Sequence, residues 1–150
     1  NDGWGINAGI DESNAKNKLI LLPQDSFKTA EVLCENFKKH FSLKKLGVLI
    51  TDTRSMPLRI GTVGKALGYA GFEPLKSYIG KKDLFGRKSR VTQSNVADAL
   101  AASAVLVMGE GNEQTPMVVI KDAPVIFSNK KGGSLALPPE GDIFGNVFRS

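Results

Sequence analysis

The chain has 150 residues, a size typical of one domain, and 41% of them are apolar, enough for a hydrophobic core. A charged fraction of 23% argues against intrinsic disorder. The longest apolar run, residues 101–108, is too short for a membrane span of roughly 20 residues. Cys34 is the single cysteine, so it has no partner for an internal disulfide. We therefore expect one domain in a reduced, cytoplasmic setting, without a membrane contact.

The net charge of +5 is compatible with two classes of partner. A basic protein can bind nucleic acid, and it can equally bind small molecules that carry phosphate. Proteins that bind single-stranded nucleic acid stack bases on aromatic side chains placed among basic residues. Here Phe27, Phe37 and Phe41 fall on a predicted core face, so a nucleic-acid-binding module is the less favoured interpretation.

The first third of the chain predicts strand, helix and strand. Residues 18–22 and 46–50 are short apolar runs typical of strands. Between them, Asp25 or Ser26 can cap a helix that continues to about Ser42. Its apolar residues recur at helical spacing and are Phe27, Ala30, Leu33, Phe37 and Phe41. Cys34 lies beside this stripe and is expected to be a packed core thiol.

Four glycines then follow at spacings of three, four and three residues, namely Gly61, Gly64, Gly68 and Gly71. On a helix they would lie along one face. Each glycine costs a helix about 1 kcal/mol relative to alanine, so such a stripe needs a compensating reason. We expect the close approach of another backbone, for example across a subunit interface.

The second half of the chain predicts a basic loop at residues 81–90 and a second helix capped by Thr92 or Ser94. The apolar face of that helix comprises Val96, Leu100, Ala101, Ala104 and Met108, and the helix ends at Gly109-Glu110-Gly111. Residues 117–120 and 124–127 are predicted strands, and residues 129–150 a loosely structured tail. The pattern predicts an α+β fold, with a mixed sheet and flanking helices.

Oxygen-bearing side chains gather at the predicted ends of these elements, where sites are common. Carboxylates and hydroxyls are the ligands that Mg²⁺ prefers, and Asp11, Asp52, Thr53 and Glu110 could supply them. The backbone amides of residues 109–112 could approach phosphate oxygens closely.

Taken alone, these clusters also have structural interpretations. Asp11 and Asn14 could only shape a turn, Asp52 could be an ordinary strand-end residue, and the glycines could simply end a helix. No Walker sequence and no complete G-x-G-x-x-G is present, so the common nucleotide-binding folds gain no support.

Six motifs, taken in order, resemble those of the coenzyme factor-420 gamma-glutamyl ligases. They lie at residues 7–14 (N-A-G-[IV]-D-x-S-N), 51–59 ([ST]-D-T followed by Pro and Arg), 61–71 (the glycine-spaced run), 83–87 (D-x-x-G-R), 95–102 (A-V-A-D-x-L-A-A) and 107–110 (V-M-G-[EQ]). Residues 78–80 and 109–116, with Ser55-Met56 in place of Gly-Arg, resemble bacterial members assigned to folate metabolism. The resemblance covers residues 7 to 121.

The resemblance implies specific roles. Asp11, Asp52, Thr53 and Glu110 would bind a divalent metal, Mg²⁺ or Mn²⁺, with K⁺ as a further candidate ion, and Asp52 and Arg87 would be catalytic. GTP, or ATP as the alternative, would be contacted by Asn14, Met108, Gly109, Glu110, Gly111, Asn112, Glu113, Gln114 and Thr115. An intertwined homodimer is implied too, with these 150 residues as the carboxyl-terminal part of a longer enzyme.

The implied reaction adds L-glutamate to an anionic cofactor substrate, either a deazaflavin F-420 precursor or a folate. A carboxylate is a poor electrophile, so γ-phosphoryl transfer would first give an acyl phosphate, which the amine of glutamate attacks. Arg87 and its basic neighbours could hold the anionic groups of the substrate, or they could be a solvated loop. A nucleotide-binding homologue without catalysis is the alternative function.

Overall fold

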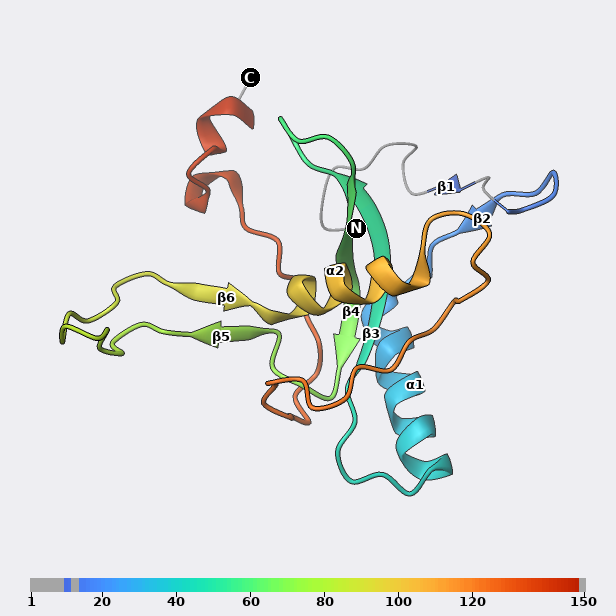
Figure 1. Cartoon of the computed structure of the whole chain (residues 1–150), viewed down its shortest axis with the longest axis horizontal. Helices are drawn as coiled ribbons and strands as arrows, with labels where there is room; N and C mark the ends of the chain where they lie inside the picture. The colour runs from blue at the N-terminus through green and yellow to red at the C-terminus, as the bar shows by residue number, and fades with distance from the viewer. Residues whose placement is uncertain (1–9, 12–13, 149–150) are drawn as a thin grey trace.

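The computed structural model describes residues 10–11 and 14–148, and within them two helices lie against a long β-hairpin (Figure 1). The elements are β1 (Ile10–Asp11), β2 (Ile20–Leu21), α1 (Ser26–His40), β3 (Val48–Ser55), β4 (Thr62–Ala70), β5 (Leu75–Ser77), β6 (Gln93–Asn95), α2 (Val96–Met108) and the 3₁₀ turns η2 (Pro139–Gly141) and η3 (Gly145–Phe148). The predicted combination of helices and strands is confirmed. The predicted mixed sheet is wrong for the described part of the chain, whose strands form three antiparallel pairs, β1–β2, β3–β4 and β5–β6.

Helix α1 confirms the prediction from its capping residue and apolar spacing. The Asp25 carboxylate accepts a hydrogen bond from the Lys28 backbone N–H at 2.8 Å, which satisfies one of the free amides of the first turn. Ala30 and Cys34 are buried against Ala70 of β4, as expected of a core face. Phe41 lies just past the helix and is 60% exposed, so the apolar stripe ends earlier than predicted.

Strand β3 continues well beyond the predicted end at residue 50. It runs to Ser55 because residues 62–70 pair with it along its whole length, from Val48–Ala70 to Ser55–Thr62. Thr51, Asp52 and Thr53 are therefore mid-strand residues, not a loop. The helical arrangement considered for the glycine-rich run does not occur for the same reason: residues 62–70 form β4.

The glycines of β4 allow both helices to reach the backbone of the strand. A Cβ at Gly64 would collide with the carbonyl of Ala101 in α2, and one at Gly68 with the carbonyl of Ser26 in α1. Leu67 has no partner in β3, and this bulge reverses the side-chain alternation, so the two glycines face different helices. The expected close backbone approach is confirmed, and the approaching backbones belong to the same chain.

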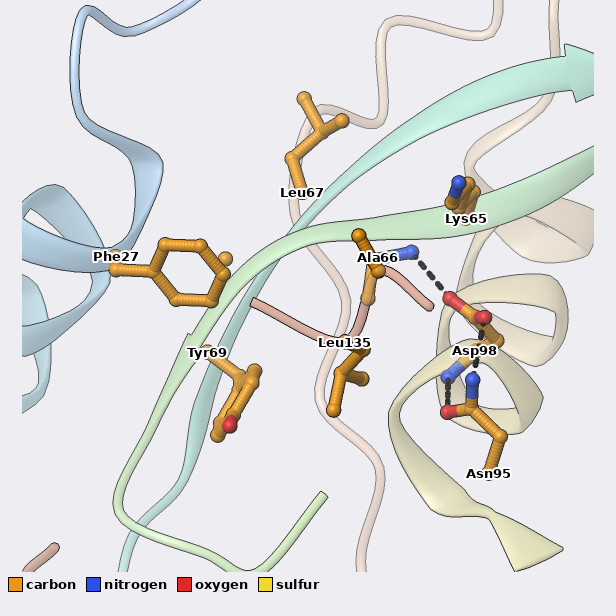
Figure 2. A pocket seen from close by; sticks show the side chains of 10 residues that line it. Phe27, Lys65, Ala66, Leu67, Tyr69, Asn95, Asp98 and Leu135 are labelled. Atoms are coloured by element: carbon orange, nitrogen blue, oxygen red, sulfur yellow. Dashed lines mark hydrogen bonds between the residues drawn. The ribbon is translucent and has the colours of Figure 1, made fainter. Parts of the chain in front are cut away.

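Helix α2 ends at Gly109, as predicted, but Asn95 caps it rather than Thr92 or Ser94. The Asn95 side-chain oxygen accepts a hydrogen bond from the Asp98 backbone N–H at 3.0 Å. The Asp98 carboxylate accepts from Asn95 Nδ2 at 2.6 Å and from the Ala66 backbone N–H at 2.9 Å (Figure 2). The first turn of α2 is thereby fixed to β4.

The late strands predicted at residues 117–120 and 124–127 do not form among the described residues. An isolated bridge joins Phe72 to Phe127, and Met117 and Val119 are exposed. Residues 126–133 nevertheless lie alongside residues 69–73, at the end of β4 and just after it. The Lys130 ammonium lies 3.0 Å from the Glu73 carboxylate, and this hydrogen bond, followed by one from Ser128, lowers the pKa of Glu73.

The buried core is small for a chain of this length. Its largest buried side chains are Tyr69 and Phe72, which pack with Ala97 of α2. The accessible surface is 12069 Å², whereas a compact monomer of 16.1 kDa exposes about 7,400 Å². Much apolar surface is therefore exposed in the isolated chain. Among the described helices, none has the length and apolar character needed to cross a bilayer.

We predict that Gly64→Ala destabilises the protein by about 1–3 kcal/mol, because the added methyl group meets the backbone of α2, which cannot move without unseating the helix. Urea unfolding followed by circular dichroism would measure the change. Gly133→Ala is the matched control, since a Cβ there meets nothing within 4 Å, and its stability should change by less than about 1 kcal/mol. Equal effects of the two substitutions would contradict the packing described for β4.

Candidate functional site

Three segments that are distant in sequence meet where α2 ends. The Thr53 hydroxyl of β3 donates a hydrogen bond to the Glu110 carboxylate at 3.2 Å, across 57 residues of sequence. The Asn14 side-chain amide donates to the Gly111 carbonyl at 2.8 Å, across 97 residues. Three of the predicted site clusters, around Asn14, Thr53 and Glu110, are thus brought together by the fold.

The electrostatics of this corner favour a cation. The last carbonyl groups of a helix have no partners within the helix and carry a partial negative charge. The last turn of α2 contains no basic residue, and Glu110 and Glu113 follow it directly. A helix C-terminus and two carboxylates therefore contribute the same sign of charge.

The donor chemistry of Thr53 and Glu110 suits a hard divalent cation, since both present oxygen atoms. The described residues contain no group of three or more His, Cys, Asp or Glu side chains close enough to hold a metal ion. Two protein oxygens fit the usual arrangement for Mg²⁺, which keeps several waters or substrate phosphates in its shell.

Asp52 does not join this pair in the present geometry. Neighbouring residues of a strand point to opposite faces of the sheet. Thr53 is paired with Gly64, whose open face is covered by α2, whereas Asp52 is paired with Lys65 on the other face. The backbone of Asp11 in β1 pairs with that of Ile20 in β2, and the predicted role of the Asp11 side chain lies outside what the structure describes.

The turn after α2 is closed by its own acidic residue. The Gly111 backbone N–H donates to the Glu113 carboxylate at 2.8 Å, and that carboxylate covers the α-carbon of Gly109. Gly109 has a φ of 79°, a conformation that favours glycine. One amide expected to face a phosphate is therefore occupied by Glu113.

The other residues predicted to contact a nucleotide lie on the same segment. Met108 is the last residue of α2, and Asn112 and Gln114 are exposed. The Thr115 hydroxyl donates to the Glu113 carbonyl at 3.2 Å. These positions leave the predicted nucleotide contacts sterically open, and the contacts stay a prediction.

Arg87 lies far from this corner. It is exposed in the loop beyond the β5–β6 hairpin, which extends from the N-terminal end of α2, while Glu110 follows the C-terminal end (Figure 1). Helix α2 has 13 residues, and at 1.5 Å per residue it separates the two segments by about 20 Å. Within one chain, the structure does not bring Arg87 to Thr53 and Glu110.

The D-x-x-G-R motif has a local structural role as well. The Asp83 carboxylate accepts hydrogen bonds from the backbone N–H groups of Phe85, at 2.9 Å, and Arg87, at 2.8 Å. Gly86 has a φ of 84°, which the tight turn requires. These contacts explain the aspartate and the glycine of the motif, but not its arginine.

One hollow was not anticipated from the sequence. A cavity of about 120 Å³ lies at the outer edge of β4, between the starts of α1 and α2 (Figure 2). Its polar wall is Asn95, Asp98 and Lys65, and its apolar wall includes Phe27, Tyr69 and Leu135. The signal was Asn95 followed three residues later by Asp98, a pattern of the capping-box type. Because Asp98 is engaged by Ala66 and Asn95, we interpret this group as structural.

Comparison with known proteins identifies relatives for most of the chain. The family described as F420-0:Gamma-glutamyl ligase matches residues 2–122. The chain is 41% identical over 140 residues to the coenzyme F420:L-glutamate ligase of Methanocaldococcus jannaschii, covering 93% of this chain and 56% of that protein. It is 44% identical over 117 residues to the enzyme of the same description from Archaeoglobus fulgidus, covering 77% of this chain and 47% of that protein. The chain thus spans about half the length of these curated relatives.

We predict that Asn14→Asp loosens the turn at residues 110–113, because a carboxylate cannot donate to the Gly111 carbonyl and adds negative charge beside Glu110. Amide hydrogen exchange at Gly111 should accelerate about fivefold, the equivalent of about 1 kcal/mol. Asn17→Asp is the matched control: Asn17 is also exposed with a positive φ. The same acceleration in both variants would mean that the Asn14 contact does not hold the turn.

Proposed function

This chain belongs to the F420-0:gamma-glutamyl ligase family, and we propose that the protein joins L-glutamate to a cofactor substrate in a reaction that depends on a nucleotide and a divalent metal. The observation that carries this proposal is the contact between Thr53 and Glu110. It unites two oxygen donors from separate motifs at the negative end of α2, beside the turn that Asn14 fastens.

The proposed chemistry follows from the poor reactivity of a carboxylate. Transfer of the γ-phosphoryl group of GTP, or of ATP, to the acceptor's carboxylate gives an acyl phosphate and a nucleoside diphosphate. The amine of glutamate then attacks the acyl carbon, the amide bond forms, and inorganic phosphate leaves with the former carboxylate oxygen. A divalent metal, when bound, neutralises charge on phosphate oxygens.

The residues of this chain have distinct roles in the proposal. Thr53 and Glu110 would hold Mg²⁺ or Mn²⁺, and Asp52 and Asp11 would supply further carboxylates for metal binding. The segment 108–115 and Asn14 hold the nucleotide. This division of the four proposed metal ligands rests on the opposite directions of Asp52 and Thr53.

The acceptor is proposed to be a deazaflavin F-420 precursor, with a folate as the rival. The names of the curated relatives favour the deazaflavin. Ser55-Met56, which stands where the better-known branch has Gly-Arg, favours the folate, because the arginine of that branch is missing here. Ser55 lies two residues beyond Thr53 on the same face of β3, and is exposed. Its position beside the proposed metal pair suits a residue that selects the acceptor.

We expect the full-length protein to form GDP or ADP only when Mg²⁺ or Mn²⁺, glutamate and one of the two acceptors are all present. Glutamate-dependent diphosphate release would be measured with each nucleotide and each acceptor in turn. Metal-dependent nucleotide binding without turnover on either acceptor would instead support a homologue that has lost catalysis.

Glu110→Gln should reduce kcat at least about tenfold and weaken metal binding, because it removes a charged oxygen from the proposed metal pair. Asp52→Asn should have an effect of similar size. Glu140→Gln is the control, since Glu140 is an exposed carboxylate in η2 with no part in the proposed site. Unchanged turnover and metal affinity in Asp52→Asn would remove that residue from the metal centre.

A further inference from the structure

The cavity at the outer edge of β4 is separate from the candidate site. It has a volume of about 120 Å³ and lies at the start of α2, whereas Glu110 follows the end of that helix (Figure 2). Leu67, the bulge residue that has no partner in β3, is one of its lining residues. Bulges re-aim side chains and are over-represented next to active sites. A hollow at a bulge, away from the proposed nucleotide and metal, is a candidate site for a second ligand.

The wall of this cavity contains one positive and one negative side chain. Lys65 and Asp98 both line it, and Figure 2 shows them on the same side of the hollow. Asp98 lies in the first turn of α2, where the positive end of the helix dipole favours a carboxylate. An ammonium group has three N–H donors, so Lys65 can serve a ligand alongside another contact. A ligand that complements this wall carries both signs of charge.

The structural role of Asp98 leaves it able to accept further hydrogen bonds. Its Oδ1 accepts from the Ala66 backbone N–H at 2.9 Å, and its Oδ2 accepts from Asn95 Nδ2 at 2.6 Å. A carboxylate offers about four acceptor sites, so each oxygen keeps capacity for one more bond. Both donors are neutral groups, and they hold the carboxylate in a fixed orientation. Asp98 is therefore preorganised to receive a cationic group.

The opposite wall is apolar and limits the size of a ligand. It includes Phe27 and Tyr69, whose rings pack edge to face with centroids 5.6 Å apart, and Leu135. The Tyr69 hydroxyl fixes the chain near Leu135, because it donates to the Gly133 carbonyl at 3.1 Å and accepts from the Gly133 N–H at 3.3 Å. A cavity of about 150 Å³ holds benzene, so one of about 120 Å³ takes roughly five or six non-hydrogen atoms.

We propose that this cavity binds a small zwitterion of the α-amino acid class. The carboxylate of the ligand accepts from the Lys65 ammonium, its own ammonium donates to Asp98, and a short apolar side chain contacts Phe27 and Leu135. A ligand with only one charge would leave one of the two charged side chains without a complement. The site is independent of the proposed function, since it shares no residue with the proposed metal and nucleotide contacts.

The first test compares three probes on the full-length protein: L-alanine, propionate, which lacks the amine, and ethylamine, which lacks the carboxylate. Calorimetric titration should give a Kd for L-alanine on the order of 1 mM, as expected for a ligand of this size. Propionate and ethylamine should each bind at least about tenfold more weakly, because each forfeits one charged hydrogen bond. Equal binding of either analogue, or no binding of L-alanine, would overturn the proposal.

The second test locates the site with variants of Lys65. Lys65→Met removes the charge and should weaken L-alanine binding at least about tenfold, whereas Lys65→Arg should bind within about threefold of the wild type. Lys44→Met is the matched control, since Lys44 is exposed in the loop between α1 and β3, and its affinity should not change. Wild-type affinity in Lys65→Met would overturn the proposal. Asp98 is left intact because its hydrogen bond with Ala66 anchors α2, so its loss would confuse binding with folding.

The third measurement is amide hydrogen exchange of the full-length protein with and without saturating L-alanine. Bound L-alanine should slow exchange in the three segments that line the cavity, residues 65–69, 95–98 and 135–136. Protection confined to other segments would overturn the proposal. No turnover is needed for any of these measurements, so the amino-acid site and the proposed ligase function stand or fall separately.

Discussion

The pairing of β3 with β4, including its single bulge, is the constraint on which the rest of the structure depends. It sets Gly64 toward α2 and Gly68 toward α1, and each glycine lets a helix backbone approach the strand where any side chain would collide. Both helices are seated by these contacts, with a second anchor for α2 where Asp98 accepts from the Ala66 backbone. A hairpin with a small core can thus hold two helices, because the contacts that position them are made by backbone atoms.

The candidate site results from these contacts between the helices and β4. Once α2 is fixed against β4, its C-terminal end lies beside β3, and Glu110 meets Thr53. Neither residue has a reason to contact the other in the local sequence. The negative end of the helix and the carboxylates beside it are then set against a strand that offers a hydroxyl on one face and a carboxylate, Asp52, on the other.

The sequence was most informative where local signals act alone. Asp25 and Gly109 mark the beginning of α1 and the end of α2, because capping and left-handed geometry depend on a few neighbouring atoms. The glycine spacing of residues 61–71 did not distinguish a helix from a strand, since a helix and a bulged strand can both place glycines against neighbouring backbones. Residues 117–127 are apolar enough for strands, yet strands need partners, which local sequence does not supply.

For the site, ordered motifs predicted which residues matter but not how far apart they lie. Thr53 and Glu110 belong to different motifs and are in contact, whereas Asp52 adjoins Thr53 and points away from it. The alternation that separates them could be derived only if β3 were known to continue past residue 50. Arg87 shows the converse, since its motif predicts a role for the residue, yet within one chain it lies beyond the opposite end of α2 from Glu110.

No linker separates β6 from α2: Asn95 ends the strand and caps the helix, so Val96 begins the first turn at once. The hairpin and the helix therefore share one junction, which Asn95 caps and which the hydrogen bond from Ala66 to Asp98 holds on β4. The direction in which the hairpin extends is therefore set by the contacts that orient the helix, although the hairpin itself makes few contacts with the body of the molecule.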